Sequence, residues 1–383
     1  MSVREGSLEA PERQPLDWKN PEFYNRDSLH KEMERVYDIC HGCRRCVSLC
    51  DSFPTLFDLI DESDTLEVDG VDKADYNKVV DQCFLCDLCA ETKCPYVPPH
   101  EWAVDFPHLM LRAKAQNFKN GDTKWRDRII TSTDPIFDAI STPGIAGMAN
   151  AAAASPTLRK MGESMVGIHK DAPLPHFETT PLTKRLPADH AVAAAPVATE
   201  RTTGKVAIYV TCYGDHNEPR VVEDMIAVLN HNGIEVKLLQ DAKCCGMPKL
   251  ELGDLKKVEQ LKDGNVPLFL QAIEDGYDLI APIPSCVLMY KQEPLSFNHV
   301  RTHMTKSNIE RKLCTPRNCT TEFETVVHTV ISDTIIYSSV QYLTRDHEYR
   351  RDEAPPGEQL TDGRDGLALR RDGLHAGSHE EHR

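Results

Sequence analysis

The sequence lacks the features that mark several common classes of protein. No stretch contains the roughly eighteen apolar residues in a row that a membrane-spanning helix requires. Lys and Arg number 44 against 60 Asp and Glu, and the net charge of −16 argues against a nucleic-acid surface and predicts repulsion from anionic lipid. No Gly-x-Gly-x-x-Gly follows a predicted strand, and no Walker-type loop is present. The sequence therefore predicts no nucleotide or flavin site of its own.

The N-terminal residues also lack the apolar core of a secretory signal. Fourteen cysteines in a chain of 383 residues without such a signal predict a reducing cytoplasm and metal sites rather than disulfides. We therefore expect a cytoplasmic protein. Any membrane contact is expected to be peripheral, at the inner face, or to occur through a partner.

Eight of the cysteines fall in two copies of one pattern. The copies are Cys40-His-Gly-Cys43-Arg-Arg-Cys46-Val-Ser-Leu-Cys50 and Cys83-Phe-Leu-Cys86-Asp-Leu-Cys89-Ala-Glu-Thr-Lys-Cys94-Pro95. Three cysteines at three-residue steps, followed by a fourth further on, are typical of a loop that binds a [4Fe-4S] cluster. The two copies therefore predict two [4Fe-4S] clusters.

The spacing also suggests which cysteines bind which cluster. In bacterial-type two-cluster proteins the fourth cysteine of each run binds the other cluster. Carried over, this rule gives Cys40, Cys43, Cys46 and Cys94 for the first cluster and Cys83, Cys86, Cys89 and Cys50 for the second. Two departures from the bacterial pattern are a longer gap before Cys94 and the absence of a proline after Cys50.

Structural zinc is the alternative occupant of these runs. Zinc prefers paired Cys-x-x-Cys units separated by a longer spacer, and a third cysteine at the same pitch is surplus to one tetrahedral ion. The spacing therefore favours iron–sulfur clusters.

Charged residues differ between the two runs. Arg44 and Arg45 lie inside the first run, whereas Asp81 and Asp87 flank or enter the second. Positive charge near a cluster favours its reduced, more negative state. The sequence predicts that the first cluster is the easier to reduce, unless both arginines simply face solvent.

The N-terminal part has helical periodicity around these runs. Ser28 is a predicted N-cap for a helix whose inward face includes Met33 and Tyr37 and which ends at the first run. A later helix is predicted to start near Pro107 and to end at Gly121.

From residue 205 the pattern changes to alternating strands and helices. Strands are predicted at 206–210, 234–239 and 277–282, and helices at 219–231, 255–261 and 267–273. A cysteine follows each strand: Cys212, then Cys244 and Cys245, then Cys286. Open α/β sheets place their sites at the carboxyl ends of strands, so we expect these cysteines to meet.

These later cysteines resemble those of a known domain. Cys212, the Cys244-Cys245-Gly246 loop and the segment Pro284-Ser-Cys286-Val-Leu-Met-Tyr-Lys-Gln-Glu293 are similar to the cysteine-rich CCG domain of heterodisulfide reductases. Together with the two cluster runs, the layout resembles the family that contains the C subunit of anaerobic glycerol-3-phosphate dehydrogenase and related iron–sulfur oxidoreductases.

The resemblance implies a non-catalytic electron-transfer subunit of an oxidoreductase. Such a subunit takes electrons from a flavoprotein dehydrogenase and passes them to a quinone or another acceptor. In relatives the CCG domain binds a further iron–sulfur centre, and here its ligands would be Cys212, Cys244, Cys245 and Cys286. Met289 stands where relatives have a last cysteine, and a thioether is a weak ligand. The alternatives for this site are a third centre, a redox-active vicinal thiol pair or a structural role.

The expected fold is an α+β multidomain protein, in which a helical, ferredoxin-type two-cluster domain precedes an α/β CCG domain. The predicted order is an arm at 1–27, the two-cluster domain at 28–130, a small-residue segment and linker at 131–204, the CCG domain at 205–295 and an atypical tail at 296–383. The tail is predicted to be disordered because it has little apolar content towards its end. One interpretation is that this end is truncated or out of frame relative to the family.

Two alternatives to the electron-transfer subunit stay open at this point. One is a thiol–disulfide redox protein similar to heterodisulfide reductase, which would use Cys244 and Cys245. The other is a zinc-stapled scaffold that binds partners without redox chemistry.

Overall fold

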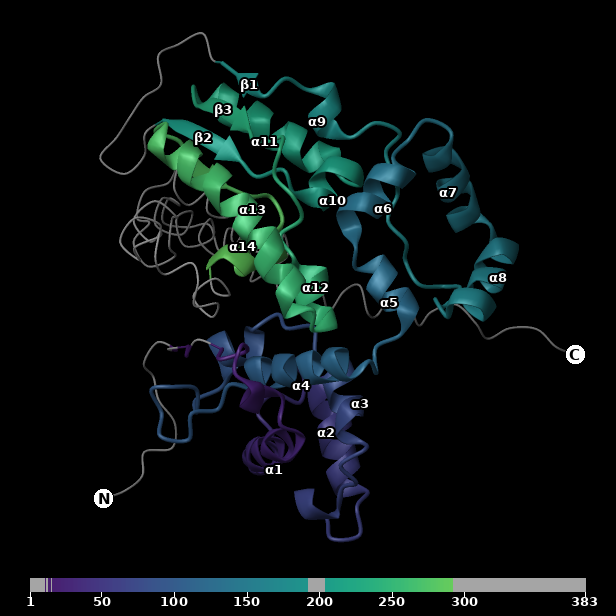
Figure 1. Cartoon of the computed structure of the whole chain (residues 1–383), viewed down its shortest axis with the longest axis vertical. Helices are drawn as coiled ribbons and strands as arrows, with labels where there is room; N and C mark the ends of the chain where they lie inside the picture. Colours follow the sequence, from purple (N-terminus) through teal and green to yellow (C-terminus); the bar gives the residue numbers. More distant parts are fainter. Residues whose placement is uncertain (1–10, 12, 15, 192–203, 292–383) are drawn as a thin grey trace, which may run out of the picture. The chain divides into compact units, whose positions relative to one another are not determined.

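The computed structural model describes residues 11, 13–14, 16–191 and 204–291. The described residues all fall within one compact unit, and they are mostly helical with one small mixed sheet (Figure 1). The predicted tail at 296–383 lies outside the described residues, as does the end of the predicted linker from residue 192 to 203.

The N-terminal part is built from short helices around the two cysteine runs. They are η1 (Pro21–Tyr24), α1 (Arg26–Cys43), α2 (Ser52–Asp61), η2 (Val68–Gly70), α3 (Tyr76–Asp81), the π-helical turn η3 (Cys89–Lys93), α4 (Phe106–Asn120) and α5 (Trp125–Ile130). The prediction that this part is mostly helical is confirmed.

Helix α1 carries the first cysteines at its C-terminal end. It begins three residues earlier than predicted, because the Asn25 side chain, rather than Ser28, caps it and accepts a hydrogen bond from the Ser28 backbone N–H. Met33 and Tyr37 are buried on its inward face, as predicted. The helix ends at Arg44, which adopts the left-handed conformation (φ 48°) and turns the chain back.

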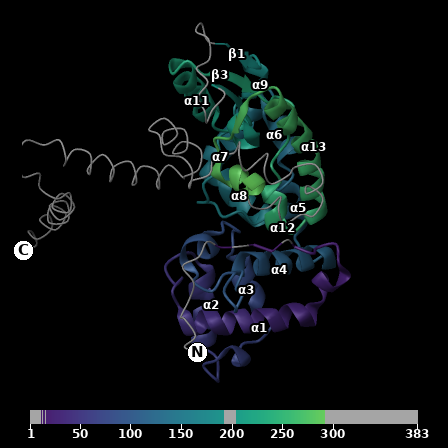
Figure 2. The ribbon, with the colours of Figure 1, turned by 90° about the vertical axis from the view of Figure 1, so that its left-hand side faces the viewer.

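Helix α4 lies beside α1 (Figure 2) and carries much of the core. Asp105 caps it, Pro107 occupies its first turn, and Gly121 ends it in the left-handed conformation (φ 88°), close to the predicted limits. Met110 and Leu111 are fully buried.

The segment from 131 to 190 contains more structure than the predicted small-residue segment and linker. It forms α6 (Thr133–Ile140), α7 (Ile145–Ala154), α8 (Pro156–Val166), α9 (Leu182–Arg185) and strand β1 (Asp189–His190). The alanine-rich and proline-started sequences of α7 and α8 favour helix, although α8 buries no side chain and α7 buries only Ala146. The apolar side chains of α8, such as Leu158, Met161 and Met165, stay exposed and add nothing to the core.

The sheet contains the predicted strands. Its order is β1, β3 (Glu235–Leu238), β2 (Lys205–Ile208), β4 (Asp278–Ile280), with β2 parallel to both β3 and β4 and β1 antiparallel to β3. Val206 pairs with Val236, and Ala207 pairs with Leu279. The carboxyl ends of the three parallel strands therefore lie at one edge of the sheet.

The helices around the sheet are α10 (Thr211–His216), α11 (Pro219–His231), α12 (Met247–Leu252), α13 (Leu255–Glu274) and α14 (Pro284–Lys291). Helix α11 has the predicted limits, but the two helices predicted at 255–261 and 267–273 are one continuous helix, α13, with Pro267 inside it. Val258 before the proline and Phe269 after it are both buried. Packing along this face outweighs the lost hydrogen bond of proline.

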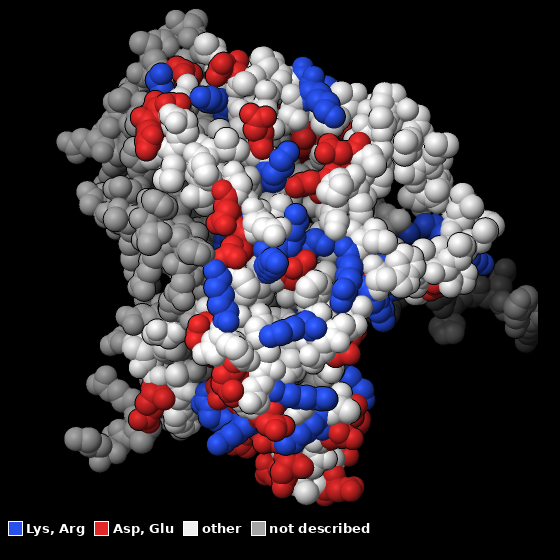
Figure 3. Space-filling view, viewed as in Figure 1, with Lys and Arg blue, Asp and Glu red and all other residues white. Residues whose placement is uncertain are grey.

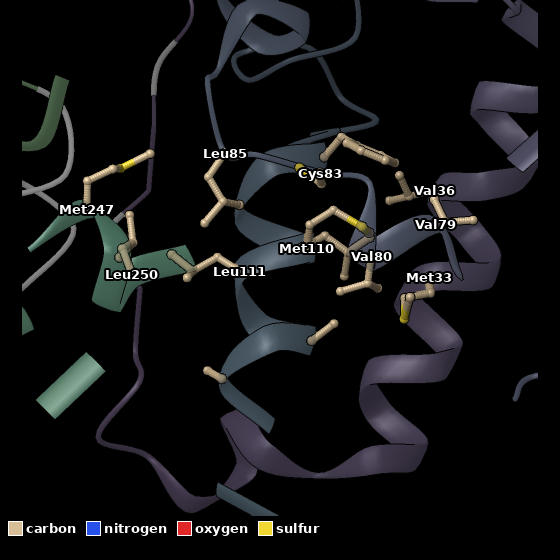
Figure 4. Close-up of a cluster of buried hydrophobic side chains, with 14 of the residues drawn as sticks. Met33, Val36, Val79, Val80, Cys83, Leu85, Met110, Leu111, Met247 and Leu250 are labelled. Atoms are coloured by element: carbon tan, nitrogen blue, oxygen red, sulfur yellow. The ribbon is translucent and has the colours of Figure 1, made fainter. Parts of the chain in front are cut away.

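One buried cluster extends from α1 and α4 to the loop and helix that follow β3. Figure 4 shows Leu111 of α4 near Leu250 of α12, and Leu85 of the second run near Met247. The end of α12 comes close to α4 at Gly253, where an added Cβ would overlap the Lys114 backbone oxygen. The cysteine runs and the cysteines after the sheet thus share one core.

The surface carries charges of both signs. On the face in Figure 3, Lys and Arg side chains are intermixed with Asp and Glu. Among the described helices, none combines the length and the apolar character needed to cross a membrane.

Candidate iron–sulfur sites

The structure brings the predicted first set of cysteines together around a cavity. Cys40 and Cys43 come from the end of α1, Cys46 from the turn after it, and Cys94 from the end of η3. All four line a small cavity that opens to solvent and is also lined by Phe53. Burial raises the pKa of the Cys40 thiol well above its usual range, and the other three sulfurs raise it further.

The predicted second set is also grouped. Burial raises the pKa of Cys83 to about 11, with further contributions from Cys50 and Cys86. Burial likewise raises the pKa of Cys89, followed by the effects of Cys83, Cys46 and Cys86. Since Cys46 belongs to the first set, the two groups adjoin. A bound iron would take the place of these protons, because the thiolate is the metal ligand.

The backbone of the second run is shaped to hydrogen-bond its sulfurs. Leu85 and Asp87 both have left-handed conformations, with φ of 52° and 62°. The Leu85 and Leu88 amides lower the pKa values of Cys83 and Cys86, respectively, against the larger opposing effect of burial. Hydrogen bonds to cysteine sulfur stabilise thiolate and help to set the potential of a cluster. The donor set of this run therefore fits an iron–sulfur cluster.

Within the part of the chain that the structure describes, no three His, Cys, Asp or Glu side chains converge closely enough to surround one metal ion. The ligands of a [4Fe-4S] cluster each bind a different iron, so they are arranged around a cube rather than around a point. The two groups are therefore defined by their shared cavity and by their mutual electrostatic effects.

The four later cysteines converge at the edge of the sheet. Cys212 lies in α10, Cys244 and Cys245 lie in the loop after β3, and Cys286 lies in α14. The Cys212 and Cys244 sulfurs are 3.9 Å apart. Hydrogen bonds from the Cys212 and Cys245 thiols hold the pKa of Cys244 well below its usual range, while bonding to Cys244 and Cys286 raises that of Cys245.

Hydrogen bonds from buried residues hold the loop of this third group in place. Gly246 adopts the left-handed conformation (φ 95°), and its amide lies 3.4 Å from the Cys244 sulfur. Asn265 of α13 is fully buried; it accepts a hydrogen bond from the Lys243 amide (2.7 Å) and donates one to the Lys243 carbonyl (2.9 Å). Met289, three residues after Cys286, is also fully buried.

Sequence reasoning missed the residues that cover this group from the 131–190 segment. The Asp134 carboxylate of α6 accepts a hydrogen bond from the Cys244 amide at 3.0 Å. Lys249 of α12 donates to the Ser132 hydroxyl (2.8 Å) and the Arg128 carbonyl (3.0 Å). A polar Asn265 within the apolar face of α13 was a detectable signal, but nothing in the sequence linked Asp134 to a loop 110 residues away.

Comparison with known proteins identifies both regions. Residues 39–97 match a family described as a 4Fe-4S dicluster domain, and residues 206–291 match the cysteine-rich domain family CCG. The chain is homologous to iron–sulfur oxidoreductase subunits. This finding confirms the resemblance predicted from the cysteine motifs, and it confirms the two kinds of domain and their order.

Three relatives illustrate the similarity. The chain is 26% identical over 186 residues to the C subunit of anaerobic glycerol-3-phosphate dehydrogenase of Escherichia coli K12, covering 48% of this chain and 45% of the relative. It is 30% identical over 89 residues to citrate utilization protein B of Escherichia coli, covering 23% of this chain and 21% of the relative. It is 32% identical over 92 residues to lactate utilization protein A of an Exiguobacterium species, covering 24% of this chain and 37% of the relative.

The chain therefore spans less than half the length of these relatives in each alignment. No solved structure matches the chain significantly.

Proposed function

We propose that the chain is an iron–sulfur electron-transfer subunit of a multi-component oxidoreductase. The observation that carries this proposal is the grouping of eight thiols into two adjoining sets in one helical domain. Cys40, Cys43, Cys46 and Cys94 would hold one [4Fe-4S] cluster, and Cys83, Cys86, Cys89 and Cys50 would hold the other. When bound, the two clusters supply neighbouring one-electron relay sites.

The role of the protein is to position the clusters and to limit their contact with water. Phe53 and Phe57 line the first group, and Leu85 at the second group lies in the buried core. Apolar surroundings and amide donors to sulfur both tune the potential of a cluster. Because the motifs for flavin and nucleotide binding are missing from the sequence, a separate flavoprotein dehydrogenase would supply the electrons and a quinone or another acceptor would receive them.

This proposal also implies a cytoplasmic protein, at most peripheral to the inner face of the membrane. The relatives include a protein named as a dehydrogenase subunit, which supports assembly with a partner dehydrogenase. Copurification of a flavoprotein with the tagged chain from its native host is the expected result.

Metal analysis of the anaerobically purified full chain tests the proposal. We expect brown protein with about eight iron and eight sulfide per chain in the two clusters, since each cluster contains four of each. EPR of the reduced protein should show signals from two clusters. Colourless, iron-free protein, or about two zinc ions per chain, would contradict the proposal and favour the zinc scaffold.

A second candidate concerns the later cysteines. The 3.9 Å separation between the Cys212 and Cys244 sulfurs is compatible with a thiol pair that cycles to a disulfide, and the four thiols are also sufficient in number for a third iron–sulfur centre. The double variant Cys212→Ser/Cys286→Ser separates the two. A third centre predicts that iron falls below that of the unmodified chain, whereas a thiol pair predicts unchanged iron and loss of the disulfide-dependent turnover that the unmodified chain shows.

A further inference from the structure

A buried ion pair joins the N-terminal arm to the second cysteine run. Asp87 lies between Cys86 and Cys89, and its side chain is only 2% exposed. Arg13 in the arm is 10% exposed, and its Nη1 donates to Asp87 Oδ2 at 2.5 Å. A carboxylate removed from water is destabilising unless it is paired, so Arg13 supplies the charge that makes a buried Asp87 tolerable.

The same guanidinium also binds the start of α4. Arg13 Nη2 and Nε donate to the two oxygens of Asp105 at 2.9 and 3.2 Å, a bidentate arrangement. Asp105 in turn accepts from the His108 amide at 3.2 Å, and its Oδ2 lies 2.9 Å from His108 Nδ1. Arg13 thus connects the loop of the second run to the helix that packs behind it.

The surroundings of Asp105 favour its ionised form. Burial alone would raise the pKa of Asp105, but the hydrogen bond and charge of His108, followed by those of Arg13, lower it well below its usual range. The Arg13 guanidinium is therefore shared by two carboxylates, those of Asp87 and Asp105.

The backbone conformation of Asp87 also requires support from neighbouring residues. Its φ of 62° is left-handed, a conformation in which a residue other than glycine needs support from its surroundings. The Asp87 side chain is anchored by Arg13, and this anchor holds the turn between two predicted ligands, Cys86 and Cys89.

We propose that Arg13 is a positioning residue for the second cluster, fixing the Cys86–Cys89 turn through Asp87 and offsetting a buried negative charge beside the cluster. The inference rests on the proposed function, which places a cluster on Cys83, Cys86, Cys89 and Cys50. Negative charge near a cluster disfavours its reduction, and it acts more strongly in a buried site than in water. Loss of Arg13 should therefore make the second cluster harder to reduce.

EPR-monitored redox titration of the anaerobically prepared full chain tests this inference. Arg13→Gln is expected to shift one midpoint potential to a more negative value and to leave the other unchanged. Asp87→Asn is expected to shift the same potential in the opposite direction. If Arg13 acts through Asp87, Arg13→Gln will have a smaller effect in the Asp87→Asn background than alone, because coupled residues are not additive.

Two further variants complete the design. Arg26→Gln, at an exposed position in α1, is the matched control and should change neither potential. Arg13→Lys keeps the charge without the bidentate geometry, so it should preserve the potential better than Arg13→Gln does. If Arg13→Gln fails to fold or loses the second cluster, the potentials are measured on Arg13→Lys instead. Selective loss of the second cluster from folded Arg13→Gln would itself support the positioning role.

The inference is overturned if Arg13→Gln retains both clusters with unchanged potentials, or if its effect is equally large without Asp87. Failure of the proposed function looks different, because the unmodified chain would then lack iron–sulfur clusters altogether.

Discussion

The two cluster runs share one cysteine pattern but place their charged residues in different environments. In the first run Arg44 is 41% exposed and pairs with Asp61, which is 50% exposed. In the second run Asp87 is 2% exposed and pairs with the 10% exposed Arg13. Solvent and salt screen the first pair, whereas the second lies in a medium where charge acts strongly. The burial of these side chains, rather than their formal charge, therefore determines how strongly they act on the predicted cluster of each run.

The two runs also differ in packing. Leu85 of the second run is 3% exposed and lies near Met247 in the core shown in Figure 4, whereas Val47 in the first run is 51% exposed. The first run instead borders a cavity that opens to solvent. The second run is therefore part of the core that includes the CCG region. Substitutions of its buried side chains should lower the free energy of unfolding more than substitutions in the first run.

The largest expected effect comes from removing ligands, which tests whether each run completes the cluster of the other. Cys40→Ser and Cys94→Ser should abolish the same EPR signal, and Cys83→Ser and Cys50→Ser should abolish the other. Each variant should lose about four iron atoms per chain, because one cluster lacks a thiolate. Iron analysis and EPR give the readout, with Ser48→Ala in the first run as a control. Equal loss of both signals in Cys94→Ser and Cys50→Ser would contradict the assignment of ligands.

A smaller effect is expected from the apolar contacts of the second run. Leu85→Ala should lower the free energy of unfolding by about 2–5 kcal/mol, because it leaves a cavity in the shared core. Leu88→Ala in the same run is the matched control; Leu88 is 48% exposed, and its change should stay within about 0.5 kcal/mol. Anaerobic urea unfolding measures both. Similar midpoints for the two variants would show that the second run is not part of the core.

These contrasts also show what the sequence could predict. The cysteine runs depend on local spacing, and the limits of α11 follow from an apolar face, a starting proline and a nearby glycine, so both were predictable. The carboxyl ends of parallel strands were enough to predict that Cys212, Cys244, Cys245 and Cys286 meet. The interpretation of 131–190 as a small-residue segment and linker missed helices such as α8, which leaves Leu158, Met161 and Met165 exposed and buries no side chain.

The polar contacts that hold the sites were beyond prediction for a different reason. Arg13 and Asp87 are 74 residues apart, and Asp134 and the Cys244 amide are 110 apart. Neither pair has a spacing or motif that links its members before the fold is known. Formal charge alone could not show that Arg13 pairs with Asp87, or that Arg44 is exposed and pairs with Asp61.

The smallest expected effect concerns this first run. From the sequence, Arg44 and Arg45 should make the first cluster the easier to reduce, and their replacement by Glu should shift its potential. Because Arg44 is exposed and paired with Asp61, while Asp87 is offset by Arg13, we now expect the shift in Arg44→Gln to be smaller than that in Arg13→Gln. It should also shrink as salt is raised, since exposed charges are screened. EPR-monitored titration at low and high ionic strength measures both, and a larger, salt-independent shift in Arg44→Gln would reverse the ranking of the two runs.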